Sequence, residues 1–186
     1  NSLQSVASLV RVYKGRAERG EDMADAFDAI GRRIEATAAL HQMLHDSPLD
    51  DAVMMDDFLK EIASLLQDSA PDNVSISCEA SPVAISTSVA SSIAVIVSEF
   101  VANSIKHAFV DGQSGHVAIS GKSLADGTLE ITCEDNGDAN PESTAAKTSA
   151  SGLGKRIMKA SASQIGATLE NGPGPKGYRM VLTLPG

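Results

Sequence analysis

The sequence between residues 99 and 109 reads EFVANSIKHAF, and its polar residues recur at helical spacing. Glu99 and Asn103 stand at i and i+4, and Lys106 or His107 follows at i+7 or i+8 on the same face of a predicted helix. The other side is apolar, with Ile93, Val97, Phe100, Val101 and Ile105. Because charged and amide groups are costly to bury without partners, this face either lines a site or is solvated. An asparagine carbonyl suits Mg²⁺, and a lysine suits a phosphate.

Two segments further along the chain favour a binding site. Glu134-Asp135-Asn136-Gly137 ends a predicted strand with an acidic turn, where a carboxylate can accept a hydrogen bond from the exocyclic amine of adenine. Ser151-Gly152-Leu153-Gly154 opens a predicted helix, whose N–H groups and positive end suit a phosphate. Lys155 and Arg156 add positive charge there. We therefore expect an ATP-type nucleotide with Mg²⁺, bound by an α/β domain that covers residues 70–186.

The order of periodic segments predicts an α/β sandwich with helices on one face of a sheet, and an α+β fold overall. Helical spacing predicts helices, and alternation predicts strands. Helices are expected at 55–66, 88–107 and 154–164, and strands at 74–78, 83–86, 116–120, 129–133, 167–170 and 178–184. Asp126-Gly127 predicts a hairpin turn. Residues 140–151 are poor in large apolar side chains and are expected to form a mobile loop.

Residues 1–48 are predicted to form an antiparallel helical hairpin. Apolar residues step by three and four from Leu3 to Ala17 and again from Met23 to Leu44, with a turn at 15–22. Two arms with one apolar stripe each bury little surface alone, so we expect a four-helix bundle made by two copies. The alternative is that the stripes pack on the rest of the same chain. The predicted domains are 1–48 and 49–186.

Composition limits the function classes. The chain has 186 residues and a net charge of −9, which argues against nucleic acid as a partner because phosphate backbones need a basic face. No run reaches the roughly 18 apolar residues of a membrane span, and no signal peptide is visible, so a cytoplasmic location without membrane contact is expected. Cys78 and Cys133 are expected to be buried free thiols. Because the chain opens at Asn1 without Met, we interpret it as a fragment.

Three further patterns resemble binding motifs without their context. The glycines from Gly172 to Gly177 match a dinucleotide fingerprint, but a strand follows them rather than a helix, which favours a tight turn. Gly121-Lys122-Ser123 lacks the earlier glycine of a P-loop. His41 and His45 have a spacing that can bind a metal, but no third ligand stands nearby, so a partly buried pair is favoured.

The ordered set of motifs resembles the ATP-binding domain shared by sensor histidine kinases, DNA gyrase, Hsp90 chaperones and MutL, the Bergerat or GHKL type. Glu99 and Asn103 look like the N box, Asp135-x-Gly137 like the first glycine box, and Gly152-x-Gly154 like the second. The helix Glu99–Phe109 is most similar to the HWE and HisKA_2-like histidine kinases. The resemblance covers nearly the whole chain and implies a dimerisation and phosphoacceptor hairpin before the catalytic domain.

The resemblance also implies roles for individual residues and partners. Asn103 would coordinate Mg²⁺, Asp135 would recognise adenine, and Glu99 would polarise the attacking imidazole or help hold the metal. The remaining site residues would shape the site and its lid or lie near the phosphates: Lys106, His107, Gly137, Gly152, Leu153, Gly154 and Lys155. The implied activity is phosphoryl transfer from Mg-ATP to a histidine and on to an aspartate of a response regulator receiver domain.

Two departures from the family pattern keep other functions open. The phosphoacceptor histidine would stand upstream of residue 1, and Asp138-Ala139 follows Gly137 where a further glycine is usual. A histidine phosphotransferase adaptor, with a degenerate ATP-binding domain that docks response regulators, is therefore the alternative. A serine kinase of the anti-sigma type shares the ATP motifs but gives no reason for the amphipathic hairpin.

Overall fold

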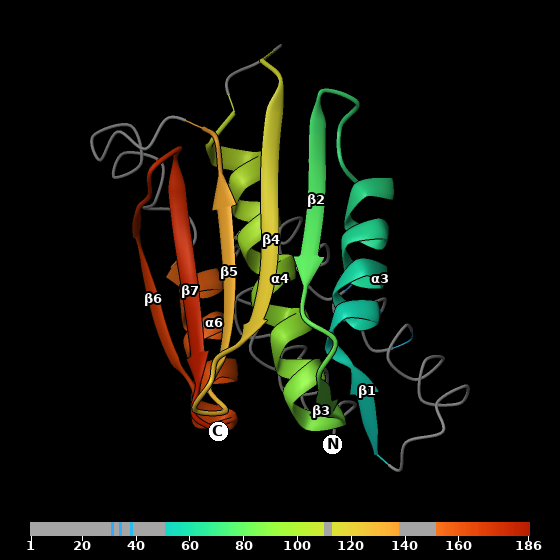
Figure 1. Ribbon diagram of the computed structural model, residues 1–186. Coiled ribbons are helices and arrows are strands. Elements are labelled where there is room, and N and C mark those ends of the chain that lie inside the picture. The colour runs from blue at the N-terminus through green and yellow to red at the C-terminus, as the bar shows by residue number, and fades with distance from the viewer. Residues whose placement is uncertain (1–30, 32–33, 35–37, 39–50, 110–112, 138–151) are drawn as a thin grey trace, which may run out of the picture.

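The computed structural model describes residues 31, 34, 38, 51–109, 113–137 and 152–186 (Figure 1). Residues 31, 34 and 38 are helical. The predicted hairpin at 1–48, the pair His41 and His45, and the loop at 140–151 otherwise lie outside the described residues.

A five-stranded mixed sheet organises the rest of the described chain, with strand order β2-β4-β5-β7-β6. Only β2 and β4 are parallel, and every other neighbouring pair is antiparallel. The strands are β2 (Val74–Ala80), β4 (Gly115–Ser123), β5 (Leu129–Asp135), β6 (Thr168–Pro173) and β7 (Tyr178–Leu184). Gly127 has a φ of 85° in the β4–β5 turn, as the Asp-Gly dipeptide predicted.

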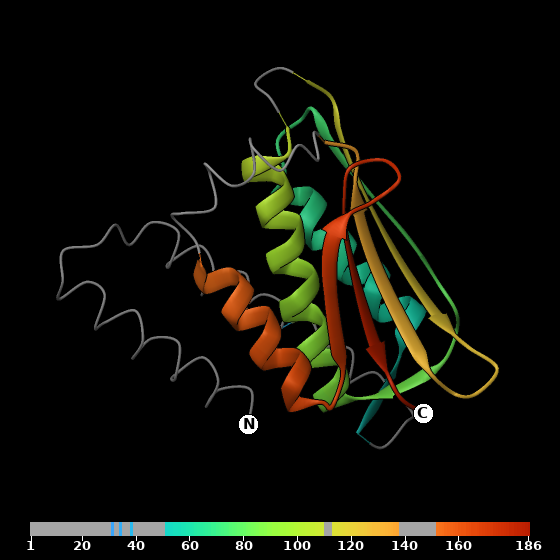
Figure 2. The ribbon, with the colours of Figure 1, turned by 90° about the vertical axis from the view of Figure 1, so that its left-hand side faces the viewer.

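One face of the sheet is apolar and covered by helices α3 (Met55–Asp68), α4 (Thr87–His107) and α6 (Gly152–Gln164). Ile119 pairs with Cys133, and Cys133 pairs with Met180, so these buried side chains share one face. Figure 2 shows the three helices on that side of the sheet and no described helix on the other. The predicted sandwich with helices on one face is therefore confirmed.

Helix α4 is the central element of the core. The Ser86 side chain accepts a hydrogen bond from Val89 N (3.4 Å) at its start, and Ile93, Val97 and Phe100 are buried. By length and mean hydropathy α4 could cross a membrane. It contains no uninterrupted run of about 18 apolar residues, because serines and Glu99 interrupt it. Because 67% of the stretch is buried inside the fold, α4 is accounted for as a core helix.

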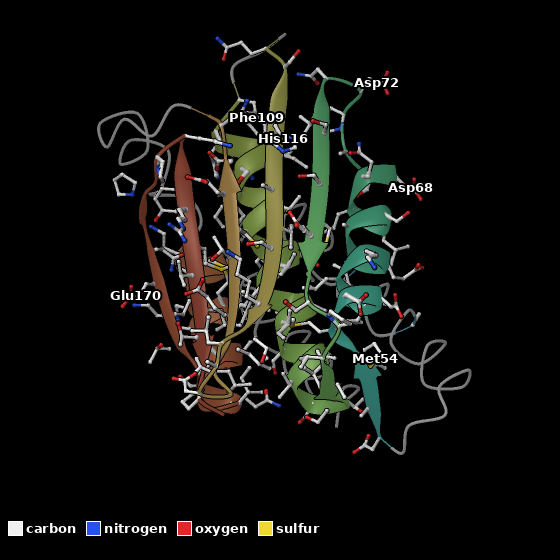
Figure 3. All side chains as sticks on the ribbon, in the orientation of Figure 1. Met54, Asp68, Asp72, Phe109, His116 and Glu170 are labelled. Carbon is white, nitrogen blue, oxygen red and sulfur yellow. The ribbon has the colours of Figure 1, made fainter. Side chains whose placement is uncertain are left out.

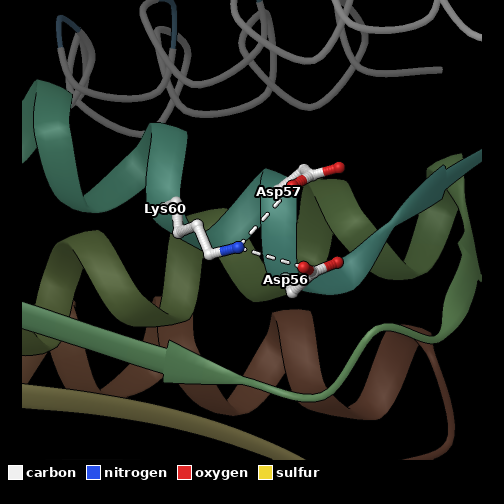
Figure 4. Close-up of polar contacts among 3 residues, drawn as sticks. All are labelled: Asp56, Asp57 and Lys60. Carbon is white, nitrogen blue, oxygen red and sulfur yellow. Dashed lines mark hydrogen bonds and ion pairs between the residues drawn. The ribbon is translucent and has the colours of Figure 1, made fainter.

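Helix α3 is amphipathic and packs beside the edge strand β2. Phe58 and Ile62 are buried, and Gln67 binds β2 twice, donating from Nε2 to Val74 O (3.0 Å) and accepting from Ile76 N (2.7 Å). Its outer side carries Lys60, whose Nζ lies 3.0 Å from Asp56 Oδ2 and 3.7 Å from Asp57 Oδ1 (Figure 4). The hydrogen bond from Lys60 lowers the pKa of Asp56.

Three details differ from the sequence predictions. Residues 52–54, expected to be linker, form strand β1 (Ala52–Met54), which pairs antiparallel with β3 (Ala84–Ser86). A three-residue strand is too short to show a period. The helix expected at 154–164 begins at Gly152. Both cysteines are free thiols, although Cys78 is only half-buried.

Candidate functional site

The end of β5 carries a buried carboxylate that three donors hold. Asp135 is 3% exposed. Its Oδ1 accepts hydrogen bonds from Gly137 N (3.1 Å) and Tyr178 N (3.0 Å), and its Oδ2 accepts one from Ser104 Oγ (2.7 Å). Ser104 lies in α4, Gly137 follows β5, and Tyr178 begins β7. Three separate segments therefore fix the orientation of this carboxylate.

Two glycines allow the backbone to approach Asp135 closely. A Cβ on Gly177 would lie 2.4 Å from Asp135 O and 2.6 Å from its Oδ1. A Cβ on Gly137 would lie 2.4 Å from Ala108 O, at the end of α4. Since no real Cβ comes this near, both positions exclude a side chain. We call Ser104, Asp135, Gly137, Gly177 and Tyr178 the Asp135 cluster.

The Tyr178 ring extends this cluster toward α4. It stacks on Phe100 with ring centroids 6.5 Å apart and an interplanar angle of 17°. Burial, and secondarily the charge of Asp135, raise the pKa of Tyr178. The aromatic contact holds the start of β7 on the same helix that supplies Ser104.

The turn after Asp135 is also tied to the start of β4. Asn136 N donates to His116 O (3.0 Å), and His116 N donates to Asn136 Oδ1 (2.7 Å). A Cβ on the neighbouring Gly115 would lie 2.6 Å from the Phe109 ring. Figure 3 shows Phe109 and His116 at the same end of the sheet. The conformation of residues 135–137 is thus set by bonds from both sides.

A second group lies where α6 starts. Glu99 is 8% exposed, Asn103 is half-buried one turn further along α4, and Gly154 is buried. A Cβ on Gly154 would lie 3.1 Å from Glu99 Oε2 and 3.5 Å from Asn103 Nδ2. The first turn of α6 therefore lies directly against both side chains. We call Glu99, Asn103 and Gly154 the Glu99 cluster.

The remaining predicted site residues lie at helix ends. Lys106 and His107 are in the last turn of α4, the former exposed and the latter half-buried. Gly152 and Leu153 open α6, and Lys155 is exposed in its first turn. The structure thus brings Asp135 together with Gly137, and Glu99 and Asn103 together with Gly154.

Sequence reasoning missed three members of the Asp135 cluster. Ser104 follows Asn103 directly, but nothing in the sequence paired it with a residue 31 positions away. Gly177 stood in the string interpreted as a tight turn, which it is, since Gly174 N donates to Gly177 O (2.7 Å). The backbone of Tyr178 carries no sequence signal, because every residue but proline has an N–H.

The donor types of the Glu99 cluster suit Mg²⁺ that is bound together with a phosphate. Among the described residues, no group of three or more His, Cys, Asp and Glu side chains could hold a metal alone. Mg²⁺ keeps several waters and needs only one or two protein oxygens together with phosphate oxygens. Glu99 and Asn103 offer a carboxylate and an amide oxygen one helical turn apart. The donor set suits a metal that arrives with a phosphate.

The fold is that of a GHKL-type ATPase domain, and family comparison agrees. Residues 88–186 match the family described as histidine kinase-, DNA gyrase B-, and HSP90-like ATPases, and the chain belongs to that family. Residues 1–70 match the HisKA_2 family, described as histidine kinase. The predicted resemblance to HisKA_2-like histidine kinases is confirmed.

The individual relatives and solved structures that the chain resembles are also histidine kinases. The chain is 26% identical over 190 residues to blue-light-activated histidine kinase 2 of Erythrobacter litoralis, covering all of this chain and 54% of that protein. It is 26% identical over 162 residues to the sensor histidine kinase PdtaS of Mycobacterium tuberculosis, covering 86% of this chain and 32% of that one. The histidine kinase domain of the Erythrobacter litoralis EL346 kinase superposes with a TM-score of 0.75 at 25% identity, over 97% of this chain and 85% of that one. The chain therefore spans about half of the first of these curated relatives and about a third of the second.

Proposed function

We propose that this chain is the core of a histidine kinase in a two-component system. It would bind Mg-ATP and transfer the γ-phosphoryl group to a histidine upstream of residue 1, and from there to an aspartate of a response regulator. The observation that carries this proposal is the Asp135 carboxylate, which is 3% exposed and held by three donors from three segments. The family matches support the class of reaction.

The Asp135 cluster would bind the base. A carboxylate accepts hydrogen bonds, so Asp135 suits the exocyclic amine of adenine. Gly137 and Gly177 let the backbone pack closely around Asp135, because a Cβ at either position would collide with Ala108 or with Asp135 itself. This recognition needs no movement of the fold, since backbone bonds already hold the carboxylate.

The Glu99 cluster would serve the phosphates. When bound, ATP supplies the γ-phosphoryl group and Mg²⁺ neutralises its charge. Asn103 would bind the metal, and Glu99 would polarise the attacking imidazole or help hold the metal. Gly152, Leu153 and Gly154 would place the start of α6 near the phosphates. Lys106, His107 and Lys155 would add charge around them.

The proposed domains are a dimerisation and phosphotransfer hairpin at 1–48 and a catalytic domain at 49–186. The burial of Met55, Phe58 and Ile62 in the same core as α4 supports placing α3 in the second domain. The match of residues 1–70 to the HisKA_2 family supports a homodimer through the hairpin. We place the protein in the cytoplasm, where its ATP is found.

Calorimetric titration with ADP, with and without Mg²⁺, tests the proposal. We expect saturable binding that Mg²⁺ strengthens. Asp135→Asn should weaken binding about a hundredfold, because an amide N–H would then face the adenine amine. The fold should survive, since Ser104 Oγ can accept from the new amide. Glu134→Gln is the matched control, because Glu134 accepts from Lys176 N (3.2 Å) beside the next turn.

Absence of binding to the wild-type chain at millimolar nucleotide would contradict the proposal. It would instead favour the phosphotransfer adaptor, which can be tested by titration with a receiver domain. Equal losses in Asp135→Asn and Glu134→Gln would remove the role given to Asp135 while leaving nucleotide binding intact.

A further inference from the structure

Ser104 is the only side chain among the described residues that donates a hydrogen bond to Asp135. It is 4% exposed, and its Oγ lies 2.7 Å from Asp135 Oδ2. A carboxylate accepts hydrogen bonds, so the hydroxyl is the donor. Because Ser104 and Asp135 are 31 positions apart, this bond also joins α4 to the end of β5.

The bond determines which acceptors remain for a ligand. A carboxylate has about four lone-pair sites, two on each oxygen. Gly137 N and Tyr178 N occupy both sites on Oδ1, and Ser104 occupies one on Oδ2. One acceptor site is left on Oδ2. The hydroxyl oxygen of Ser104 can also only accept, since its one hydrogen is engaged.

We propose that Ser104 is a positioning residue that makes the Asp135 cluster specific for a purine with a 6-amino group. With Ser104 in place, the cluster offers acceptors alone, which match the amine of adenine and oppose the 6-oxo group of guanine. Without it, the carboxylate loses the bond that orients Oδ2, and water can replace the hydroxyl. This inference rests on the proposed nucleotide binding.

The alternative explanation is that the Ser104 hydrogen bond only stabilises the packing of α4 against β5. Helix α4 offers a matched control in Ser92, which is also 4% exposed and donates its hydroxyl to Ser88 O (3.0 Å). Ser92→Ala removes one buried serine hydrogen bond from the same helix, away from Asp135. A difference between the two alanine variants therefore reports the position and not the lost bond.

The test compares ADP with purine riboside 5′-diphosphate, which lacks the 6-amino group, and with GDP. Titrations use the whole chain with Mg²⁺. Ser104→Ala should lower the affinity for ADP about tenfold and change the affinity for purine riboside diphosphate less than about twofold. The preference for ADP over GDP should fall about tenfold with it. Ser92→Ala should leave all three affinities at their wild-type values.

If Ser104 had a purely structural role, Ser104→Ala would lower the affinities for ADP and for purine riboside diphosphate equally. That result would overturn the inference. Ser104→Thr keeps the hydroxyl and should restore the wild-type ratio of the two affinities. If the wild-type chain binds ADP and Ser104→Ala binds it equally well, the inference fails and the proposed function stands. If the wild-type chain binds none of the nucleotides, the proposed function fails and this inference with it.

Discussion

The two clusters of the candidate site differ in how they are held. In the Asp135 cluster, two of the three donors are backbone N–H groups, and the third is the hydroxyl of the buried Ser104 side chain. In the Glu99 cluster, longer side chains from one helix meet the first turn of another at Gly154. Backbone donors belong to the fold itself, whereas side chains one turn apart on a helix can change without disturbing it. We therefore expect substitutions in the first cluster to cost stability and binding together, and those in the second to cost binding alone.

Gly177→Ala should have the largest effect, because its Cβ would lie 2.4 Å from Asp135 O. Overpacking of this kind lowers the free energy of unfolding by about 1–3 kcal/mol. Because the Asp135 carboxylate would also be displaced, the affinity for ADP should fall as well. Gly172→Ala is the matched control, since nothing lies within 4 Å of its Cβ position in the same hairpin. Urea denaturation and ADP titration measure both effects. Equal stability of the two variants would contradict the difference drawn between the clusters.

Asn103→Ala should affect ligand binding alone. Asn103 is half-buried, so we expect the unfolding free energy to change by less than about 0.5 kcal/mol. Mg²⁺ should no longer strengthen ADP binding, whereas the affinity measured without Mg²⁺ should stay close to that of the wild type. Asn171→Ala removes an exposed asparagine from β6 and serves as the control. Persistence of the Mg²⁺ effect in Asn103→Ala would remove the metal role proposed for this residue.

The same difference explains what the sequence could and could not predict. Glu99 and Asn103 stand four apart in one helix, so local periodicity was enough to place them together. Asp135 was recognisable by its position at a strand end. Ser104 was not, because its contact with Asp135 depends on how α4 packs across β5. Pairings between distant segments follow from tertiary packing, which no local pattern encodes.

Gly177 and β1 show two further limits. The glycine string containing Gly177 predicted a turn correctly, but the reason for a glycine there is the close approach of Asp135 from another strand. Strand β1 has three residues and pairs with a strand 30 positions later, so its own sequence carries too little pattern. In both cases the missing information lies in the partner segment.

The smallest predicted effect is on the titration of Tyr178, which reports the charge within the Asp135 cluster. Burial first, and Asp135 second, raise the pKa of this phenol above its ordinary value of about 10. Below that pH both the folded and unfolded states hold the proton. As the pH rises from that ordinary value toward the raised one, the folded state keeps a proton that the unfolded state has lost. The stability that Tyr178 contributes is therefore complete at neutral pH and is lost in alkaline solution.

Tyr13→Phe leaves Tyr178 as the one tyrosine of the chain, so near-ultraviolet absorbance follows it alone. We expect its midpoint to lie above that of free tyrosine. Adding Asp135→Asn should lower the midpoint, because the neighbouring negative charge is gone, yet burial should keep it above the ordinary value. Adding Asn103→Ala should leave the midpoint where it was, since the Glu99 cluster contributes no cause to the shift of Tyr178. If Asn103→Ala moved the midpoint as far as Asp135→Asn does, the two clusters would be one electrostatic unit, and the comparison between them would not hold.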